Sequence, residues 1–142
     1  MTFFVGVLDF SAGTLTYSSA GHNPPWLFTG GNPATLKSLA VIGPRLGERL
    51  DERNFKEQQI AIGVGDVVFL YTDGILEGKN AEGTDMFGKR RTLAALKAGA
   101  PQGPKAMLET MMSTFATFNG EKEFDDDVTL ATVTILKTGE GV

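Results

Sequence analysis

The 142-residue sequence contains no cysteine and only one histidine. The lack of cysteine excludes disulfides, thiolate metal sites and cysteine nucleophiles. A single histidine also excludes a multi-histidine metal site within one chain. Any metal ion would therefore have to bind carboxylates, which favours hard ions such as Mg²⁺ or Mn²⁺.

Strong net charge and long apolar runs are absent as well. The 13 basic and 17 acidic residues give a net charge of −4, which argues against a broad electrostatic grip on nucleic acid. No apolar run approaches the ~20 residues that span a bilayer. The apolar opening, residues 1–10, contains Asp9 and lacks a basic start, so we expect a strand there and not a signal peptide. We expect a cytoplasmic protein with neither nucleic acid nor membrane as a partner.

The length and composition of the sequence suit one domain covering residues 1–142. Hydrophobic residues make up 42% of the chain, enough to build a core. The 18 glycines lie between apolar runs, so they mark turns and not a flexible linker. No internal repeat or domain boundary is evident.

Apolar periodicity predicts strands first, then helices, then a last strand. A segment with apolar residues on both faces, 66–71, is expected to be central and buried. This order predicts an α+β fold with mainly antiparallel sheets. The predicted strands are 3–8 and 14–19 (a hairpin), 25–29, 35–39, 55–62, 66–71 and 128–136. The predicted helices are 89–98 and 104–118, the second with a stripe of Met107, Leu108, Met111, Met112, Phe115 and Phe118.

Asp73 is the first candidate functional residue, because it lies at the end of the buried strand. A carboxylate held rigidly at a strand tip suits a metal ligand. Asp followed by Gly is also a common turn signal, so an ordinary turn is the alternative.

The acidic triplet 125–127 is the second candidate. Three adjacent carboxylates repel one another unless they are solvated or bound to a cation. Because the triplet enters the last predicted strand, Asp126 should face one side while Asp125 and Asp127 face the other. A solvated acidic loop is the alternative.

Two further segments carry polar groups. His22 could act as a base or ligand, or be a structural histidine bonded to backbone. The segment 43–47 could hold a phosphate, with Arg45 as the anion contact. Its glycines lack the spacing and the lysine of a P-loop, which favours an ordinary loop.

Four segments, taken in order, resemble motifs of the SpoIIE/RsbU-type bacterial phosphatases. These enzymes are a branch of the metal-dependent PPM (PP2C-like) serine/threonine phosphatases. The motifs are Y-x-N-A-G-H-N-P-P at residues 17–25, G-D-x-L-x-L-Y-T-D-G-x-x-E at 65–77, F-G-x-x-R-L at Phe87-Gly88 followed by Leu93, and D-D-x-T-L at 126–130. Together they are spread over most of the chain, from residue 17 to residue 130.

The resemblance implies a PP2C-like sandwich of antiparallel sheets flanked by helices. It also implies two Mn²⁺ or Mg²⁺ ions that activate a bridging water for in-line attack on a phosphoserine or phosphothreonine. Asp73, Asp126 and Asp127 become the implied metal ligands. The implied substrate is a phosphorylated anti-sigma-factor antagonist, in sigma-factor regulation. The accessory residues implied beside the ligands are Gly74, Glu77, His22 and Asn23.

The chain departs from the family pattern in two places. The upstream G-G-D-x-x-D motif, whose first Asp bridges the two ions, has no counterpart in the sequence, and Arg45 stands where the family often has proline. The chain thus resembles roughly the C-terminal two-thirds of the catalytic domain, incomplete at its N-terminus. We therefore expect weak or no phosphatase activity from this chain alone.

Three other expectations follow from this incomplete resemblance. Missing strands should leave an unpaired sheet edge, which invites a homodimer. A non-catalytic regulatory module with the same fold is the alternative to an enzyme. A Ca²⁺-binding domain built on residues 125–127 is a third possibility, although Ca²⁺ needs six to eight oxygen ligands.

Overall fold

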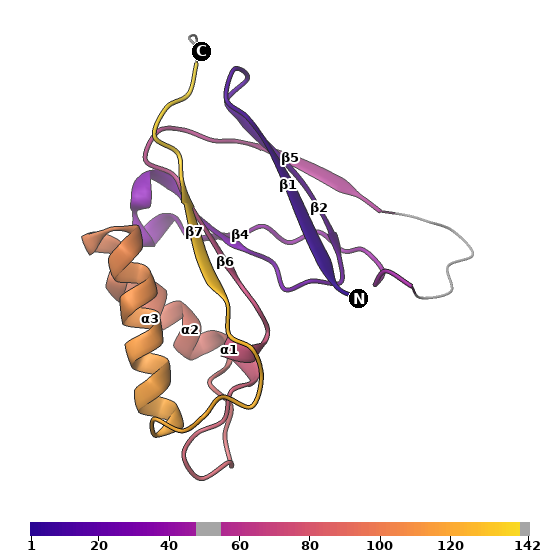
Figure 1. Cartoon of the computed structure of the whole chain (residues 1–142). Helices are drawn as coiled ribbons and strands as arrows, with labels where there is room; N and C mark the ends of the chain where they lie inside the picture. The colour runs from indigo at the N-terminus through magenta and orange to yellow at the C-terminus, as the bar shows by residue number, and fades with distance from the viewer. Residues whose placement is uncertain (48–54, 140–142) are drawn as a thin grey trace.

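The computed structural model describes residues 1–47 and 55–139. Two antiparallel sheets lie face to face, and helices cover the free face of one of them (Figure 1). The three-stranded sheet has the spatial order β1 (Phe3–Asp9), β2 (Thr14–Ala20), β5 (Glu57–Ala61). The four-stranded sheet has the order β4 (Lys37–Ser38), β3 (Trp26–Phe28), β6 (Val67–Tyr71), β7 (Leu130–Thr134).

The predicted hairpin is confirmed as β1 and β2. Leu8 lies opposite Leu15 in the antiparallel register. The Asp9 carboxylate accepts a hydrogen bond from the backbone N–H of Ala12 at 2.8 Å, and Gly13 takes a φ of 62°. The turn is therefore closed by the Asp side chain and by a glycine in the left-handed region.

Strand β6 lies at the centre of the molecule, as predicted for a strand that is apolar on both faces. Val68 packs into the core between the two sheets, together with Leu15 and Leu27. Val67 and Phe69, which point the other way, belong to the core between the four-stranded sheet and the helices. One strand thus contributes to both cores.

The helices cover only one sheet among the described residues. They are α1 (Gly74–Glu77), α2 (Gly88–Gly99) and α3 (Pro104–Asn119), and all three pack against the four-stranded sheet (Figure 1). The opposite outer face, on the three-stranded sheet, exposes Phe3, Val5 and Val7 of β1. None of the helices in the described part of the chain is long and apolar enough to cross a membrane.

The α+β class and the antiparallel sandwich are confirmed, whereas several element boundaries differ from the prediction. The strand predicted at 35–39 is reduced to β4, because Pro33 starts a 3-10 turn that the Asn32 side chain caps by accepting from the Ala34 N–H at 2.9 Å. The last strand begins at Leu130. The prediction that residues 125–127 alternate along a strand is therefore wrong, since the acidic triplet lies in the loop before β7.

Candidate functional site

Thr72 joins the end of β6 to the segment that precedes β7. Its backbone N–H donates to the Thr129 carbonyl at 3.1 Å, and its hydroxyl donates to the Asp127 carbonyl at 3.0 Å. The Thr129 N–H in turn donates to the Thr72 hydroxyl oxygen at 2.9 Å. These bonds hold the end of the acidic segment beside residues 72–74, although the two are more than 50 positions apart in sequence.

Gly74 allows the two segments to approach closely. A Cβ at this position would lie 2.5 Å from the Asp127 carbonyl oxygen, closer than any side chain tolerates. Gly74 is also buried at the first position of α1. Gly74 therefore lets α1 and the acidic segment pack closely.

Asp73 immediately precedes α1 and Glu77 is its last residue, and both line one polar hollow. The Asp73 carbonyl accepts from the backbone N–H groups of Leu76 and Glu77, which fixes the start of α1. Both carboxylates are exposed. We call this the Asp73 hollow, and its volume is about 380 Å³. Its lining residues are Thr2, Gly21, His22, Asn23, Arg45, Thr72, Asp73 and Glu77.

Asp126 lines a second hollow, here the Asp126 hollow. Glu77 borders both hollows, so they adjoin one another across α1. One Asp126 carboxylate oxygen accepts from the Asp127 N–H at 2.8 Å. The lining residues of the Asp126 hollow are Gly74, Glu77, Gly78, Lys79, Asp125 and Asp126. The structure thus brings the predicted ligands Asp73 and Asp126 to the same end of the molecule, in neighbouring hollows, while Asp127 contributes its backbone to the junction.

His22 and Asn23, in the segment that follows β2, form another wall of the Asp73 hollow. The His22 Nδ1 atom lies 2.8 Å from the Asn23 carbonyl oxygen, which can only accept, so Nδ1 carries the proton and donates. The Ser19 hydroxyl accepts from the His22 backbone N–H at 3.2 Å. These contacts match the interpretation of His22 as a structural histidine bonded to backbone.

Tyr71 anchors this wall to β6. Its hydroxyl donates to the Pro24 carbonyl at 3.2 Å. Burial raises the pKa of the Tyr71 hydroxyl, which keeps it protonated and able to donate. The segment that carries His22 is thereby tied to the strand that leads to Asp73.

The oxygen donors of the Asp73 hollow suit one hard cation. The carboxylates of Asp73 and Glu77 line this hollow, and Mg²⁺ commonly binds through one or two carboxylates, waters and substrate phosphate. Across residues 1–47 and 55–139, no group of three or more histidine, aspartate or glutamate side chains is placed to hold a metal ion. The donor chemistry fits a single ion, and the carboxylate cluster of a two-ion centre is not assembled by these residues.

One polar residue has a role that the sequence alone does not predict. Asp66 is buried, and its two carboxylate oxygens accept from the Gly30 N–H at 2.7 Å and the Gly63 N–H at 2.9 Å. It therefore holds two turns together and is structural. Arg45, for which the sequence leaves both an anion contact and an ordinary loop open, lines the Asp73 hollow.

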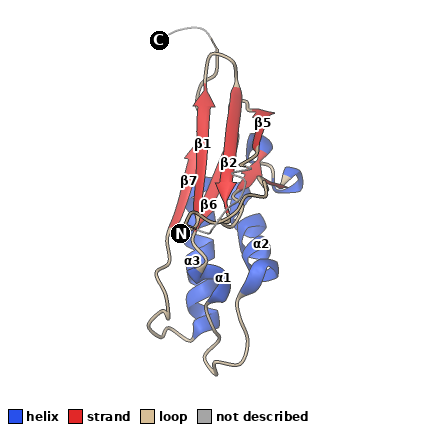
Figure 2. Ribbon diagram, turned by 90° about the vertical axis from the view of Figure 1, so that its right-hand side faces the viewer, coloured by secondary structure: helices blue, strands red, loops and turns tan. Residues whose placement is uncertain are grey.

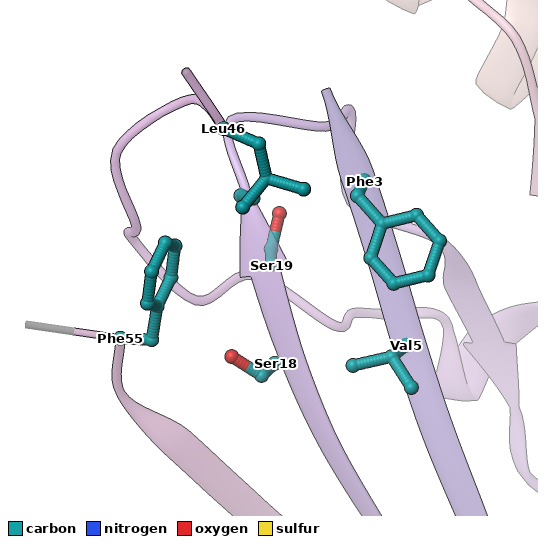
Figure 3. Close-up of a pocket in the computed structure, with 7 residues that line it drawn as sticks. Phe3, Val5, Ser18, Ser19, Leu46 and Phe55 are labelled. Atoms are coloured by element: carbon teal, nitrogen blue, oxygen red, sulfur yellow. The ribbon is translucent and has the colours of Figure 1, made fainter. Parts of the chain in front are cut away.

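A different hollow lies on the outer face of the three-stranded sheet (Figure 3). Its lining residues are Phe3, Val5, Ser18, Ser19, Ala20, Leu46 and Phe55. None of these side chains is a carboxylate, a base or a metal ligand of the kind expected here. This hollow belongs to an apolar surface and offers no comparable chemistry.

Comparison with known proteins decides the family. The model of the family described as stage II sporulation protein E (SpoIIE) matches residues 1–136. The chain belongs to the SpoIIE family. The resemblance inferred from the four sequence motifs is thereby confirmed.

Three known proteins match over nearly the whole chain. Protein IcfG of Synechocystis is 28% identical over 131 residues, which is 92% of this chain and 20% of IcfG. The RsbU and RsbW domains of a Mycobacterium tuberculosis protein superpose with a TM-score of 0.71 at 25% identity, over 98% of this chain and 37% of that one. The manganese-presoaked phosphatase domain of Bacillus subtilis SpoIIE gives a TM-score of 0.66 at 15% identity, over 99% of this chain and 59% of that one. This SpoIIE-family chain therefore has the PP2C-like fold and spans about a fifth of IcfG.

Proposed function

We propose that this chain is the catalytic part of a metal-dependent protein serine/threonine phosphatase. The observation that carries the proposal is the Asp73 hollow, where Asp73 and Glu77 face an open, polar space beside the acidic segment of Asp126. Membership in the SpoIIE family supports phosphomonoester chemistry at this place. The solved SpoIIE domain presoaked with manganese supports Mn²⁺ or Mg²⁺ as the ion.

Some residues of the Asp73 hollow would bind the metal ion, and others would hold the surrounding segments in place. A bound Mg²⁺ or Mn²⁺ ion polarises a phosphoester and lowers the pKa of its bound water. Asp73 and Glu77 would hold the ion, with Asp126 as a further oxygen ligand from the adjoining hollow. Thr72 keeps these segments together through its three hydrogen bonds. His22 and Asn23 shape another wall of the hollow.

The proposed substrate is a phosphorylated protein of the anti-sigma-factor-antagonist type, acting in the cytoplasm. A matched relative carries RsbU and RsbW domains in one chain, which supports a role in sigma-factor regulation. We also propose that this chain alone turns over slowly. Two carboxylates in one open hollow hold a single ion weakly, whereas the two-ion mechanism needs both charges in a defined geometry.

Calorimetric titration with MnCl₂, and in parallel with MgCl₂ and CaCl₂, tests the metal site. We expect Mn²⁺ to bind in preference to Ca²⁺, and Asp73→Asn to weaken Mn²⁺ binding by about tenfold or more, since a carboxylate is the ligand that hard cations require. Glu109→Gln is the control, because Glu109 is an exposed carboxylate on α3, paired only with Lys105 at 3.5 Å.

The other outcomes favour the alternatives. Preference for Ca²⁺ would support a calcium-binding domain. The absence of binding by any of the three ions would support a non-catalytic module. Rapid hydrolysis of p-nitrophenyl phosphate with Mn²⁺, abolished by Asp73→Asn, would support the phosphatase and contradict the slow turnover proposed for this chain.

We propose, in addition, that two copies of the chain pair through β1. No strand among the described residues pairs with the outer edge of β1. If two β1 strands paired antiparallel with Gly6 opposite Gly6, then Val5 would face Val7 and Phe4 would face Leu8. The apolar pattern is therefore complementary to itself. The two Asp9 carboxylates would lie at opposite ends of the pair, which keeps the like charges apart.

A further inference from the structure

The segment 43–47 brings a guanidinium group to the Asp73 hollow. Arg45 lines the same hollow as Asp73 and Glu77, and it is the only lysine or arginine among the described residues that do so. The hollow therefore combines two carboxylates with one permanent cation. A site that binds only a metal ion has no use for that cation, which would repel the ion.

Two glycines place Arg45 at this position. A Cβ on Gly43 would lie 2.0 Å from the Ser19 carbonyl oxygen, so the segment crosses the end of β2 at a distance that only glycine allows. Gly21 has a φ of 69°, and a Cβ there would lie 2.7 Å from the Arg45 Cγ atom. The methylene stem of Arg45 thus lies directly on Gly21. Its guanidinium extends from a stem whose position is determined by packing.

We propose that Arg45 binds the phosphoryl group of the substrate, a phosphoserine or phosphothreonine dianion. The inference rests on the proposed function, because it assumes that the phosphoester enters the Asp73 hollow. A planar guanidinium donates two parallel hydrogen bonds to phosphate oxygens. The carboxylates of Asp73 and Glu77 alone would repel a dianion, whereas a metal ion between them and Arg45 beside them would hold it from both sides.

A surface ion pair would be the ordinary role of such an arginine. The ion pairs among the described residues join Arg91 to Asp85 at 2.7 Å and Lys105 to Glu109 at 3.5 Å. Neither involves Arg45, although two carboxylates line the same hollow. The stem of Arg45 is held by its packing on Gly21, and no carboxylate among the described residues forms an ion pair with its guanidinium.

Calorimetric titration with phenylphosphonate, a phosphomonoester analogue that cannot be hydrolysed, tests the inference on the full chain saturated with Mn²⁺. We expect wild type to bind, and Arg45→Ala to bind about tenfold to a hundredfold more weakly, as for loss of hydrogen bonds to a charged group. Arg45→Lys should bind phenylphosphonate with an affinity between those of wild type and Arg45→Ala, because lysine keeps the positive charge but lacks the paired N–H donors of the planar guanidinium. Arg90→Ala is the matched control, since Arg90 is exposed on α2 outside both hollows.

Separate Mn²⁺ titrations of each variant distinguish this inference from the proposed function. We expect Arg45→Ala to bind Mn²⁺ at least as tightly as wild type, because a repelling charge has been removed. The role of Arg45 would be overturned if wild type and Arg45→Ala bound phenylphosphonate equally, or if Mn²⁺-loaded wild type did not bind phenylphosphonate. Neither result would contradict the proposed metal site. Loss of Mn²⁺ binding in Arg45→Ala would also overturn the inference, by showing a structural role. Absence of Mn²⁺ binding by wild type would overturn both.

Discussion

At the scale of single residues, Gly74 controls how closely the acidic segment approaches α1. We expect Gly74→Ala to lower the free energy of unfolding by about 1–3 kcal/mol, because the new Cβ would meet the Asp127 carbonyl oxygen at 2.5 Å. The same displacement should weaken Mn²⁺ binding, since it moves Asp126 away from Asp73. Urea unfolding and calorimetry measure the two effects.

Gly63→Ala is the matched control for this substitution. A Cβ at Gly63 would have no neighbouring atom within 4 Å, and the residue has no left-handed φ. We expect its free energy of unfolding to change by about 0.5 kcal/mol or less. Equal stability of the two variants would contradict the close approach at Gly74.

The candidate site can be predicted from sequence only as separate pieces. Asp73 at a strand tip and the acidic triplet are both recognisable, because strand ends and charge runs are local features. Their proximity depends on the hydrogen bonds of Thr72 across more than 50 residues, which no local pattern reveals. The sequence identifies Arg45 as an anion contact only in principle, because its place in the hollow depends on contacts with Gly21, which is distant in sequence.

At the scale of elements, α3 illustrates what periodicity can and cannot predict. The sequence predicts the helix almost to its ends, from Pro104 at its start and the glycine after it. The predicted apolar stripe is broader than the buried one, which consists of Met107, Met111 and Phe115. The period follows from the sequence, whereas the row of side chains that faces the sheet is decided by packing.

Two neighbouring methionines on α3 test this assignment. Met111 is completely buried, while Met112 is only partly buried. We expect Met111→Ala to cost about 2–5 kcal/mol of unfolding free energy, as for other large-to-small core substitutions. Met112→Ala should cost less than half as much, because its truncation leaves a smaller cavity. Urea unfolding of both variants measures the difference, and equal costs would contradict the observed face of the helix.

At the scale of the whole molecule, the sandwich is open along one side. Strands β1 and β7 are edge strands of their sheets and lie on the same side (Figure 2). Between them, Phe4, Gly6 and Leu8 line a largely apolar hollow together with Leu70 and Val133. An edge strand without lysine or proline, beside an apolar gap, lacks the features that prevent strand pairing between chains. The fold therefore favours association on this side.

The substitution Val7→Lys tests whether two copies pair through β1. Val7 and Val64 have the same residue type and the same exposed fraction, 63%, but Val7 lies on β1 whereas Val64 lies in the turn before β6. We expect wild type and Val64→Lys to form dimers with rising concentration, measured by light scattering. Val7→Lys should dimerise less than Val64→Lys, because it replaces the apolar Val5–Val7 contacts across the paired strands with lysine–valine contacts and puts a charge on the edge strand. A monomeric wild type at high concentration, or equal dissociation of both variants, would exclude pairing through β1.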